Sequence, residues 1–250
     1  MRAVVLAAGL GTRLRPLTDV LPKALCPVGN RALVDWALER VAAVADDIAV
    51  NVHAGRAQME QHLRGCGVHV SIEADEALGT AGALGLLREW IDGRPVLVTN
   101  ADAFHGFDVG VLVDGWEGVQ PRLLVVEDRE RPDFDGRWRY VGSSLLAWRH
   151  VAGLEPVPSG LYEALWSKVD VELVPVEGAF FDCGTPSDYL AANLHASGGH
   201  SVVGAGAVVE GELVRSVVWP GGVVRADERL VESIRVGADL TVEAPLRLNR

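Results

Sequence analysis

Two glycines and several basic side chains follow the first apolar segment of this 250-residue chain. Gly9 and Gly11 are separated by one residue, and Arg13, Arg15 and Lys23 come after them. Glycines let backbone N–H groups approach phosphate oxygens closely, while guanidinium and ammonium groups neutralise the phosphate charge. The sequence therefore predicts a phosphate-binding loop, although a Gly-x-Gly pair alone is equally typical of a tight strand-to-helix turn.

Two better-known phosphate motifs do not fit this loop. A dinucleotide fingerprint, GxGxxG, would need glycine at position 14, where the chain has Leu14. A P-loop needs a lysine directly after its last glycine, and here Thr12 follows Gly11. The loop therefore indicates another class of phosphate chemistry.

Two aspartates stand where carboxylates could bind a metal ion. Asp102 closely follows the apolar segment 94–99, and Asp182 follows two phenylalanines. Mg²⁺ is commonly held by one or two carboxylates, with water and substrate phosphates completing its shell. The pair predicts a Mg²⁺ site. For each aspartate alone the alternative is a helix cap or a solvated loop, and Asp182 precedes a predicted helix at 186–194.

A third group of residues fits a nucleoside. Glu73 is followed by Gly79 and Thr80 at the start of a predicted helix. Small residues at a helix start let a flat base and a sugar lie against the backbone. A carboxylate such as that of Glu73 can accept hydrogen bonds from the N–H edge of guanine. The alternative for Glu73 is an exposed acid at the end of a strand.

The charge distribution supports a local anion site. The formal charge is −11, yet residues 1–31 hold five basic side chains against one acid and carry +4. Residues 32–250 therefore carry −15. A protein that coats nucleic acid needs many Lys and Arg side chains to neutralise phosphates, so we expect no nucleic-acid partner.

The remaining composition is that of a globular protein. No apolar run reaches the roughly 18 residues of a membrane span, and the segment after Met1 is strand-like, unlike a signal peptide. Cys26, Cys66 and Cys183 are scattered and form no Cys-x-x-Cys pair. We therefore expect reduced thiols, no structural zinc, no membrane partner and a cytoplasmic location.

Apolar strands alternate with amphipathic helices along the first part of the chain. The alternation predicts βαβ units and a Rossmann-like, mostly parallel sheet flanked by helices. Ligands of such sheets bind at the carboxyl ends of the strands. Strands are predicted at 2–8, 48–52, 68–72, 94–99, 122–127, 140–148 and 171–176. Helices are predicted at 31–45, 56–64, 80–91, 159–167 and 186–194.

The C-terminal residues follow a different period. Aliphatic side chains recur every six residues, at Val218, Val224, Leu230, Val236 and Val242. This period resembles the hexapeptide repeats of a parallel β-helix, with a few β-hairpins as the alternative. We therefore expect a catalytic domain at 1–196 and a short tail at 200–246, which is too small to bury a core alone.

Five segments, in this order, resemble the sugar-1-phosphate nucleotidylyltransferases, or NDP-sugar pyrophosphorylases. The family pattern is LAxGxGTRLxPLT with PKxLxPV, then LGTAGAL, then NxD, then an aromatic residue followed by xDxGTPxxYLxAN. The matching segments are 6–18, 22–28, 78–84, 100–102 and 181–193. The resemblance implies a Mg²⁺-dependent enzyme that joins an NTP to a sugar 1-phosphate and releases pyrophosphate. The tail is similar to the left-handed β-helix that many members append.

The resemblance also implies roles for the matched residues. Arg13 would stabilise the departing pyrophosphate, Lys23 would act at the α-phosphate, and Asp102 and Asp182 would bind Mg²⁺. The nucleotide would be held by Ala8, Gly9, Gly11, Thr12, Glu73, Gly79 and Thr80. Because the sugar phosphate oxygen attacks phosphorus directly, alignment and charge neutralisation suffice without a side-chain nucleophile.

The sugar half matches the family pattern least. Asn100 and Gly142 are the candidates for the sugar phosphate, and the acid for the sugar hydroxyls is Glu127 or Glu163. The LGTAGAL segment is similar to mannose-1-phosphate guanylyltransferases. The charged loop at 128–139 is similar to N-acetylmuramate-1-phosphate uridylyltransferases. We favour GTP with mannose 1-phosphate, and the alternative is UTP or dTTP with another sugar.

Two other classes of protein are alternatives to an enzyme of this kind. A catalytically silent sensor of the same fold would have lost a charged residue, but all four are present: Arg13, Lys23, Asp102 and Asp182. A hexapeptide-repeat acyltransferase needs a histidine within its coils, and the tail has only His200 at its edge. For the tail we expect a packing role or a contact that forms a homo-oligomer.

Overall fold

The chain folds as two compact units. The computed structural model describes residues 1–246. The first unit comprises residues 1–10 and 34–180, and the second comprises residues 11–33 and the chain from residue 181 onward. The glycine loop is therefore divided between the units. Within residues 1–246, no helix is both long and apolar enough to cross a membrane.

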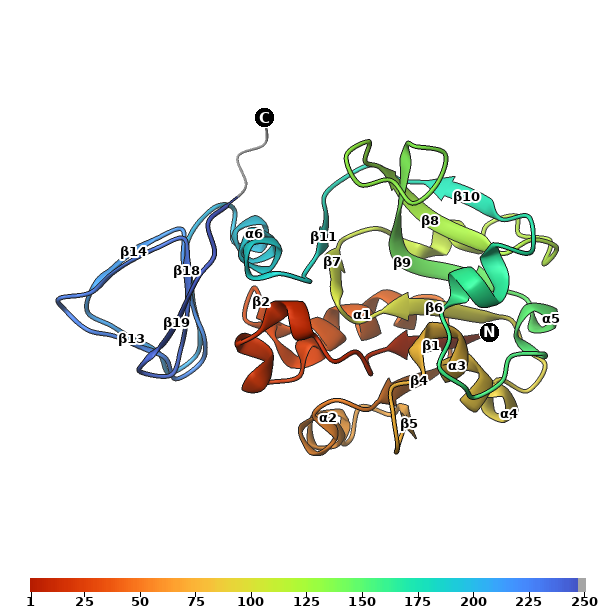
Figure 1. Cartoon of the computed structure of the whole chain (residues 1–250), viewed down its shortest axis with the longest axis horizontal. Helices are drawn as coiled ribbons and strands as arrows, with labels where there is room; N and C mark the ends of the chain where they lie inside the picture. Colours follow the sequence, from red (N-terminus) through yellow and green to blue (C-terminus); the bar gives the residue numbers. More distant parts are fainter. Residues whose placement is uncertain (247–250) are drawn as a thin grey trace. The chain divides into compact units, whose positions relative to one another are not determined.

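A seven-stranded sheet forms the centre of the first unit (Figure 1). Its pairings are parallel except for the two that β9 makes with β6 and β8. In spatial order the strands are β10 (Glu172–Pro175), β8 (Arg122–Glu127), β9 (Trp138–Leu146), β6 (Val96–Asn100), β1 (Arg2–Leu6), β4 (Asp47–Val52) and β5 (His69–Ile72). The predicted α/β class with a largely parallel sheet is thus confirmed. The continuous apolar runs of β1 and β6 are explained by burial on both faces.

Helices cover both faces of this sheet. Val4 and Val98 point to the face covered by α3 (Gly79–Leu86), α4 (Arg88–Ile91) and α5 (Trp148–Val151). Thr99 points to the opposite face, where Arg40 of α1 (Leu33–Ala42) donates a hydrogen bond to its hydroxyl. Beside α1 lies α2 (Arg56–Leu63), with His62 Nε2 2.8 Å from Asp35 Oδ1.

Small residues let another segment of the chain cross α3 closely. A Cβ at Gly82 or Gly85 would overlap the backbone of Val157 or Glu155. The same segment continues along the helix start, where the N–H of Ala81 donates to the carbonyl of residue 159 at 3.0 Å. The predicted helix at 80–91 is therefore two helices, α3 and α4, and its small residues pack against residues 155–161.

The second unit begins with three short turns and a hairpin. The turns are Thr12–Leu14, Leu17–Asp19 and Lys23–Leu25, and the hairpin strands are β2 (Pro27–Val28) and β3 (Arg31–Ala32). Helix α6 (Pro186–Ala196) packs against β2. Asn193 of α6 accepts a hydrogen bond from the N–H of Gly29 at 3.1 Å, and the Tyr189 hydroxyl donates to the carbonyl of Pro27. This helix thus fixes the loop that follows Lys23.

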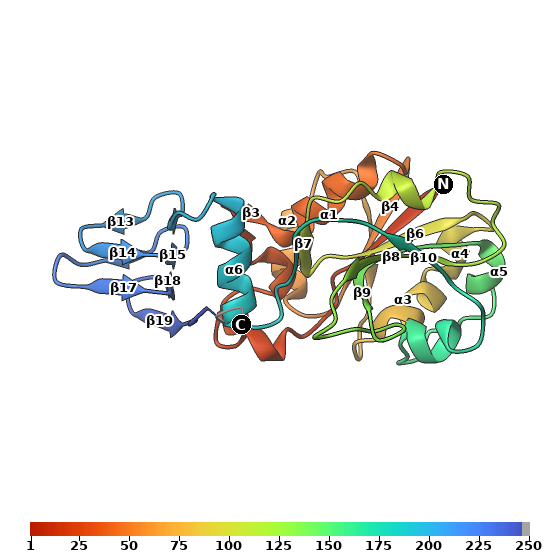
Figure 2. The same ribbon diagram turned by 90° about the horizontal axis from the view of Figure 1, so that it is seen from above.

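Short strands make up the tail, and Figure 1 shows them as the sides of a triangle. Three parallel sets pair within it, β12–β15–β18, β13–β16 and β14–β17, and β19 adds an antiparallel edge. Figure 2 shows α6 beside β15 and β18, and Trp219 donates through Nε1 to the Tyr189 hydroxyl at 3.0 Å. The strands are β12 (Val202–Val203), β13 (Val208–Val209), β14 (Glu212–Val214), β15 (Val217–Val218), β16 (Val223–Val224), β17 (Arg229–Val231), β18 (Ser233–Val236) and β19 (Leu240–Glu243).

The six-residue period holds for part of the tail only. Val218, Val224 and Leu230 share one buried cluster, as the period predicts. The six-residue period predicts that Val236 follows Leu230 in this stack. That prediction is wrong by one residue, because Val218 pairs in register with Arg235. The buried Arg235 guanidinium donates to the Val223 carbonyl at 2.8 Å, and Glu228 neutralises its charge. The coil from Val218 to Arg235 is one residue shorter than the period predicts. A buried ion pair between Arg235 and Glu228 therefore stands where an aliphatic side chain was predicted.

Candidate functional site

Arg13, Lys23 and Asp182 lie together in the second unit. Lys23 Nζ is 3.7 Å from Asp182 Oδ1, and Arg13 Nη2 is 3.8 Å from Asp182 Oδ2. The Lys23 side chain is 6% exposed, that of Asp182 30% and that of Arg13 69%. Two cations therefore flank one carboxylate at distances longer than a good hydrogen bond. We call these three residues the Arg13–Lys23–Asp182 cluster.

Two glycines make room for this cluster. Gly11 has a φ of 62°, and a Cβ there would lie 2.8 Å from Thr18 Cγ2 and 3.1 Å from Lys23 Cβ. The Thr18 hydroxyl donates to the Gly11 carbonyl at 2.9 Å, which fixes the loop against the base of Lys23. At Gly184, a Cβ would lie 2.8 Å from Arg13 Nη2 and 3.0 Å from Asp182 Oδ1. Both positions therefore need the absence of a side chain.

Asp182 does not cap the helix that follows it. The N-cap of α6 is Thr185, whose hydroxyl accepts from the N–H of Asp188 at 3.2 Å. The alternative that Asp182 caps this helix is therefore wrong. Asp182 ends β11 (Phe180–Asp182), a short strand that the sequence pattern did not predict.

The predicted metal ligands are carboxylates, the donor type that Mg²⁺ prefers. Asp182 belongs to the second unit, and Asp102 follows β6 in the first. Within residues 1–246, no group of three or more His, Cys, Asp or Glu side chains is placed to hold a metal. The donor set fits Mg²⁺ in its chemistry, and the metal site stays a prediction.

The carboxyl ends of β1 and β6 bring other predicted residues to one edge of the sheet in the first unit. Leu6 and Asn100 are paired in register, and the N–H of Ala101 donates to the Leu6 carbonyl at 2.9 Å. Ala8 and Gly9 lie two and three residues after the end of β1, and Asp102 lies two residues after the end of β6. This edge is where a parallel sheet places its ligands.

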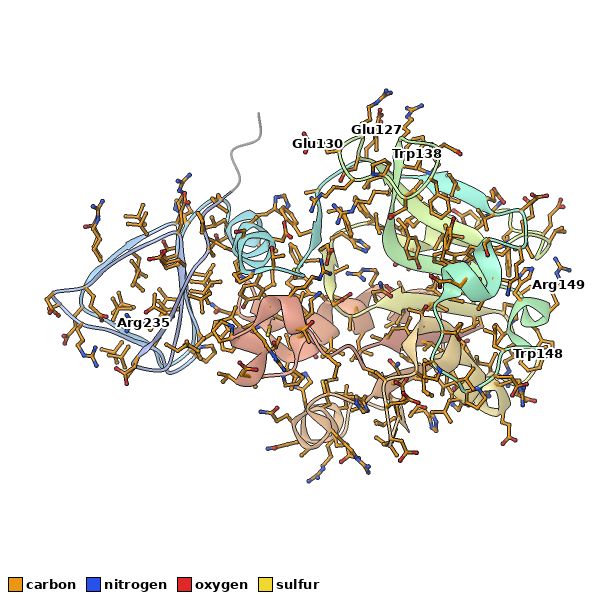
Figure 3. All side chains as sticks on the ribbon, in the orientation of Figure 1. Glu127, Glu130, Trp138, Trp148, Arg149 and Arg235 are labelled. Carbon is orange, nitrogen blue, oxygen red and sulfur yellow. The ribbon has the colours of Figure 1, made fainter. Side chains whose placement is uncertain are left out.

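The predicted sugar residues Asn100 and Gly142 are neighbours. A Cβ at Gly142 would lie 3.0 Å from both Cβ and Nδ2 of Asn100. Glu127 lies elsewhere on the sheet, in register with Trp138, and Figure 3 shows both on the hairpin that joins β8 and β9. Hydrogen bonds from Arg129 and Arg137 hold the pKa of the Glu127 carboxyl below its usual value. The alternative acid, Glu163, folds its carboxylate over Gly160.

Glu73 is buried, so its description as an exposed strand-end acid is wrong. One carboxylate oxygen, Oε1, accepts from Asn51 Nδ2 at 2.7 Å, and Oε2 accepts from the N–H of Leu78 at 2.8 Å. The Asn51 side chain in turn accepts from the N–H of Ala7 at 2.7 Å. The carboxylate that is predicted to contact a base is 3% exposed, and both of its oxygens already accept hydrogen bonds within the protein.

Gly79 and Thr80 contact another segment of the same chain, residues 159–161. The Thr80 hydroxyl accepts from the N–H of Leu161 at 2.7 Å, and a Cβ at Gly79 would lie 2.6 Å from the carbonyl oxygen of Ser159. Their predicted role in nucleotide binding stays a prediction. What the structure describes for both is packing against residues 155–161.

Two polar residues near the sheet edge, the buried Asn51 and the half-buried Arg40, were not predicted. Asn51 interrupts the apolar strand β4, and that interruption was the available signal. Arg40 donates to the Thr99 hydroxyl at 3.1 Å and to the Ala103 carbonyl at 3.4 Å, just after Asp102. Burial lowers the pKa of Arg40 to about 10. Its signal was a position on the buried face of the amphipathic helix α1.

The free thiols do not form part of these groups of residues as reactive centres. None of the three cysteines, Cys26, Cys66 and Cys183, forms a disulfide. Burial raises the pKa of the Cys26 thiol to about 12, despite the opposing effect of Lys23. Cys26 is therefore a thiol at neutral pH and packs as a small apolar side chain.

Comparison with known proteins places the chain among nucleotidyltransferases. Residues 2–126 match the family model described as "Nucleotidyl transferase". A mannose-1-phosphate guanyltransferase of Candida albicans is 30% identical over 231 residues, covering 76% of this chain and 63% of the relative. An N-acetylmuramate alpha-1-phosphate uridylyltransferase of Caulobacter vibrioides is 41% identical over 120 residues, covering 45% of this chain and 50% of the relative. This chain thus spans less than two thirds of the length of either relative.

The fold is shared with solved structures of low sequence identity. HddC from Yersinia pseudotuberculosis, solved with GMP-PN, aligns with a TM-score of 0.63 at 18% identity. The alignment covers 78% of this chain and 98% of HddC. At this identity the likeness establishes the fold alone.

Proposed function

Because the chain belongs to the nucleotidyl transferase family, we propose that it is a Mg²⁺-dependent sugar-1-phosphate nucleotidyltransferase. It condenses an NTP with a sugar 1-phosphate to give an NDP-sugar and pyrophosphate. GTP and mannose 1-phosphate are the favoured pair, in line with the relative from Candida albicans.

The observation that carries this proposal is the Arg13–Lys23–Asp182 cluster. It combines a buried ammonium, an exposed guanidinium and a partly exposed carboxylate within 4 Å contacts. Transfer of a nucleotidyl group moves negative charge onto the departing pyrophosphate, and fixed cations stabilise that charge. Gly11 and Gly184 let the backbone approach these side chains closely, because a Cβ at Gly11 would collide with Thr18 and Lys23 and one at Gly184 with Arg13 and Asp182.

Each residue of the cluster has a distinct part in the transfer. A phosphate oxygen of the sugar 1-phosphate attacks the α-phosphorus in line with the bond to pyrophosphate, which breaks. Lys23, held rigidly by burial, neutralises the α-phosphate. Arg13 is exposed and long enough to follow the β- and γ-phosphates as they leave. No side-chain nucleophile is required, since the substrate supplies the attacking oxygen.

Asp102 and Asp182 are the residues proposed to hold Mg²⁺. When bound, the ion would withdraw charge from the phosphate oxygens and orient the triphosphate. The protein supplies the two carboxylates, and Lys23 and Arg13 orient that of Asp182.

Further substrate contacts are proposed within each of the two units. Ala8, Gly9 and Thr12 are proposed to hold the nucleotide phosphates together with Gly11. Asn100 beside Gly142 is proposed for the sugar phosphate; the missing side chain at Gly142 lets the Asn100 side chain pack closely against that backbone.

A panel of nucleotides and sugars tests the proposal. Five NTPs are incubated with six sugar 1-phosphates and Mg²⁺, and released pyrophosphate is measured. We expect one pair to exceed all others, and chelation of Mg²⁺ to abolish release. Nucleotide binding without turnover in every pair would instead identify a silent sensor of the same fold.

A second candidate is a UTP-dependent enzyme. The relative from Caulobacter vibrioides has the higher identity, although over a shorter stretch than the guanyltransferase. In that case UTP with N-acetylmuramate 1-phosphate gives the highest rate in the panel.

For the tail we propose a short left-handed β-helix that packs on α6 or joins two copies of the chain. Its parallel pairs and its triangular arrangement in Figure 1 support this geometry. The division into a catalytic domain at 1–196 and a tail at 200–246 stays a prediction, as does a cytoplasmic location.

A further inference from the structure

A buried hydrogen-bond chain joins the start of the glycine loop to the start of α3. It runs from the N–H of Ala7 to Asn51 Oδ1, from Asn51 Nδ2 to Glu73 Oε1, and from the N–H of Leu78 to Glu73 Oε2. The three distances are 2.7, 2.7 and 2.8 Å. Asn51 and Glu73 are 2% and 3% exposed. We call these contacts the Glu73 chain.

The direction of every bond in the Glu73 chain is fixed. Backbone N–H groups stand at both ends and can only donate. Between them lie one amide, which accepts on one side and donates on the other, and one carboxylate, which accepts twice. Only this order of groups satisfies all four, and an unsatisfied buried donor is costly.

The Glu73 backbone adds a further restraint. Its N–H donates to the Val52 carbonyl at 2.9 Å, and its carbonyl lies 2.8 Å from His53 Nδ1. The residue is thus fixed at both backbone and side chain against the end of β4. Little freedom is left for its carboxylate to reach a bound base.

We propose that Glu73 is a positioning residue for nucleotide binding, which holds residues 7–9 and 78–80 in fixed register through Asn51. Its carboxylate does not contact the base. This role in nucleotide binding rests on the proposed function, whereas the hydrogen-bond chain itself is testable without any substrate.

Exchanging the amide and the carboxylate between positions 51 and 73 distinguishes a positioning role of Glu73 from a direct contact with the base. In Glu73→Gln, an amide N–H₂ must face a donor, either Leu78 N–H or the Asn51 side chain. If Asn51 turns over to accept, its own N–H₂ then faces the N–H of Ala7. In Asn51→Asp/Glu73→Gln, the new carboxylate accepts from Ala7 and from Gln Nε2, and Gln Oε1 accepts from Leu78. The double variant thus restores every bond with unchanged charge and nearly unchanged size.

The first measurement is amide hydrogen exchange at Ala7 and Leu78 without substrate. We expect each single variant, Glu73→Gln and Asn51→Asp, to exchange at least tenfold faster at these amides. We expect the double variant to return to within about threefold of the wild type. Glu76→Gln, an exposed acid of the same loop, is the matched control and should change nothing. Unchanged exchange in Glu73→Gln, or no recovery in the double variant, would overturn the proposal.

The second measurement is steady-state kinetics of the same variants. Each single substitution is expected to raise KM for the NTP at least tenfold while KM for the sugar 1-phosphate stays within twofold. A role in stability alone would lower kcat by reducing the active fraction and leave both KM values unchanged. If Glu73 contacts the base, the double variant will keep the altered base preference of Glu73→Gln instead of recovering. Absence of turnover in the wild type would refute the proposed function and leave the exchange result standing.

Discussion

The Arg13–Lys23–Asp182 cluster and the Glu73 chain are built from similar groups but differ in spacing. In the cluster, the charged atoms lie 3.7 and 3.8 Å apart, and two of the three side chains are partly or largely exposed. In the Glu73 chain, donors and acceptors lie 2.7 to 2.8 Å apart, and the side chains of Asn51 and Glu73 are buried. The charged groups of the cluster are partly open to solvent, whereas the Glu73 chain pairs its groups in short internal hydrogen bonds.

This difference in spacing and burial supports different roles for the carboxylates of Asp182 and Glu73. Asp182 lies 3.7 and 3.8 Å from two cations and is 30% exposed, so its carboxylate is open to solvent. Glu73 already accepts from two fixed donors and is 3% exposed, so little of its carboxylate surface is left for a ligand. The distances to its partners and its burial, more than the residue type, therefore distinguish a carboxylate proposed to bind a ligand from one proposed to position the backbone.

The largest expected effect comes from removing the buried cation. Lys23→Met keeps the length of the stem and deletes the ammonium that neutralises the α-phosphate. We expect kcat to fall by about 100- to 1,000-fold, as for loss of one transition-state donor. Lys168→Met is the matched control, because Lys168 is the only other lysine and is exposed. Equal rates for Lys23→Met and the wild type would remove the cluster from the mechanism.

Asp182→Asn tests the carboxylate of the cluster. The amide is nearly isosteric but is a poorer Mg²⁺ ligand and no longer attracts Lys23. We expect turnover to fall about 100-fold and the Mg²⁺ concentration for half-maximal rate to rise. Asp239→Asn, an exposed aspartate of the tail paired with Arg225, should leave both values unchanged. A wild-type Mg²⁺ dependence in Asp182→Asn would contradict the assignment.

Gly184→Ala tests the spacing within the cluster. The added Cβ would lie 2.8 Å from Arg13 Nη2, so the guanidinium must move away from Asp182. Because Arg13 is exposed and flexible, we expect a moderate loss, about tenfold in kcat, with an unchanged melting temperature. Gly153→Ala, where nothing lies within 4 Å of the added Cβ, is the control. A large fall in melting temperature for Gly184→Ala would show a packing role instead.

The smallest expected effect is on stability, and it comes from His105, a buried side chain outside both the Arg13–Lys23–Asp182 cluster and the Glu73 chain. His105 is 5% exposed, and burial, aided by Arg40, lowers its pKa to about 2. The unfolded chain binds a proton near pH 6.5 and the folded chain does not, so stability falls as the pH drops below about 6.5. This single group contributes a slope of about 1.4 kcal/mol per pH unit.

His105→Gln should therefore flatten the acid side of the stability profile without changing kcat at pH 7.5. Chemical denaturation at pH 5 and pH 7 measures the slope in both proteins. An identical slope would mean that His105 becomes protonated in the folded chain.

The sequence predicted the largely parallel sheet, because apolar periodicity is a local signal, and rare residue types singled out the candidate site residues. β8 was predicted at its observed bounds, 122–127, and Lys23 stood out as one of two lysines. The orientation of Glu73 was not predictable in this way. It depends on Asn51, a residue from another strand, and on the backbone direction of Ala7 and Leu78. The one-residue shift at Arg235 likewise depends on the length of a coil, which side-chain pattern alone does not specify.

Phosphorus NMR of a reaction mixture tests the central claim most directly. The chain is incubated with Mg²⁺, GTP and mannose 1-phosphate, and in a second sample with UTP and N-acetylmuramate 1-phosphate. In one of them we predict equal amounts of pyrophosphate and a sugar-linked diphosphate, and neither product with Lys23→Met in place of the wild type. Formation of a nucleoside diphosphate with inorganic phosphate, or bound nucleotide without any product in both samples, would contradict nucleotidyl transfer by the Arg13–Lys23–Asp182 cluster.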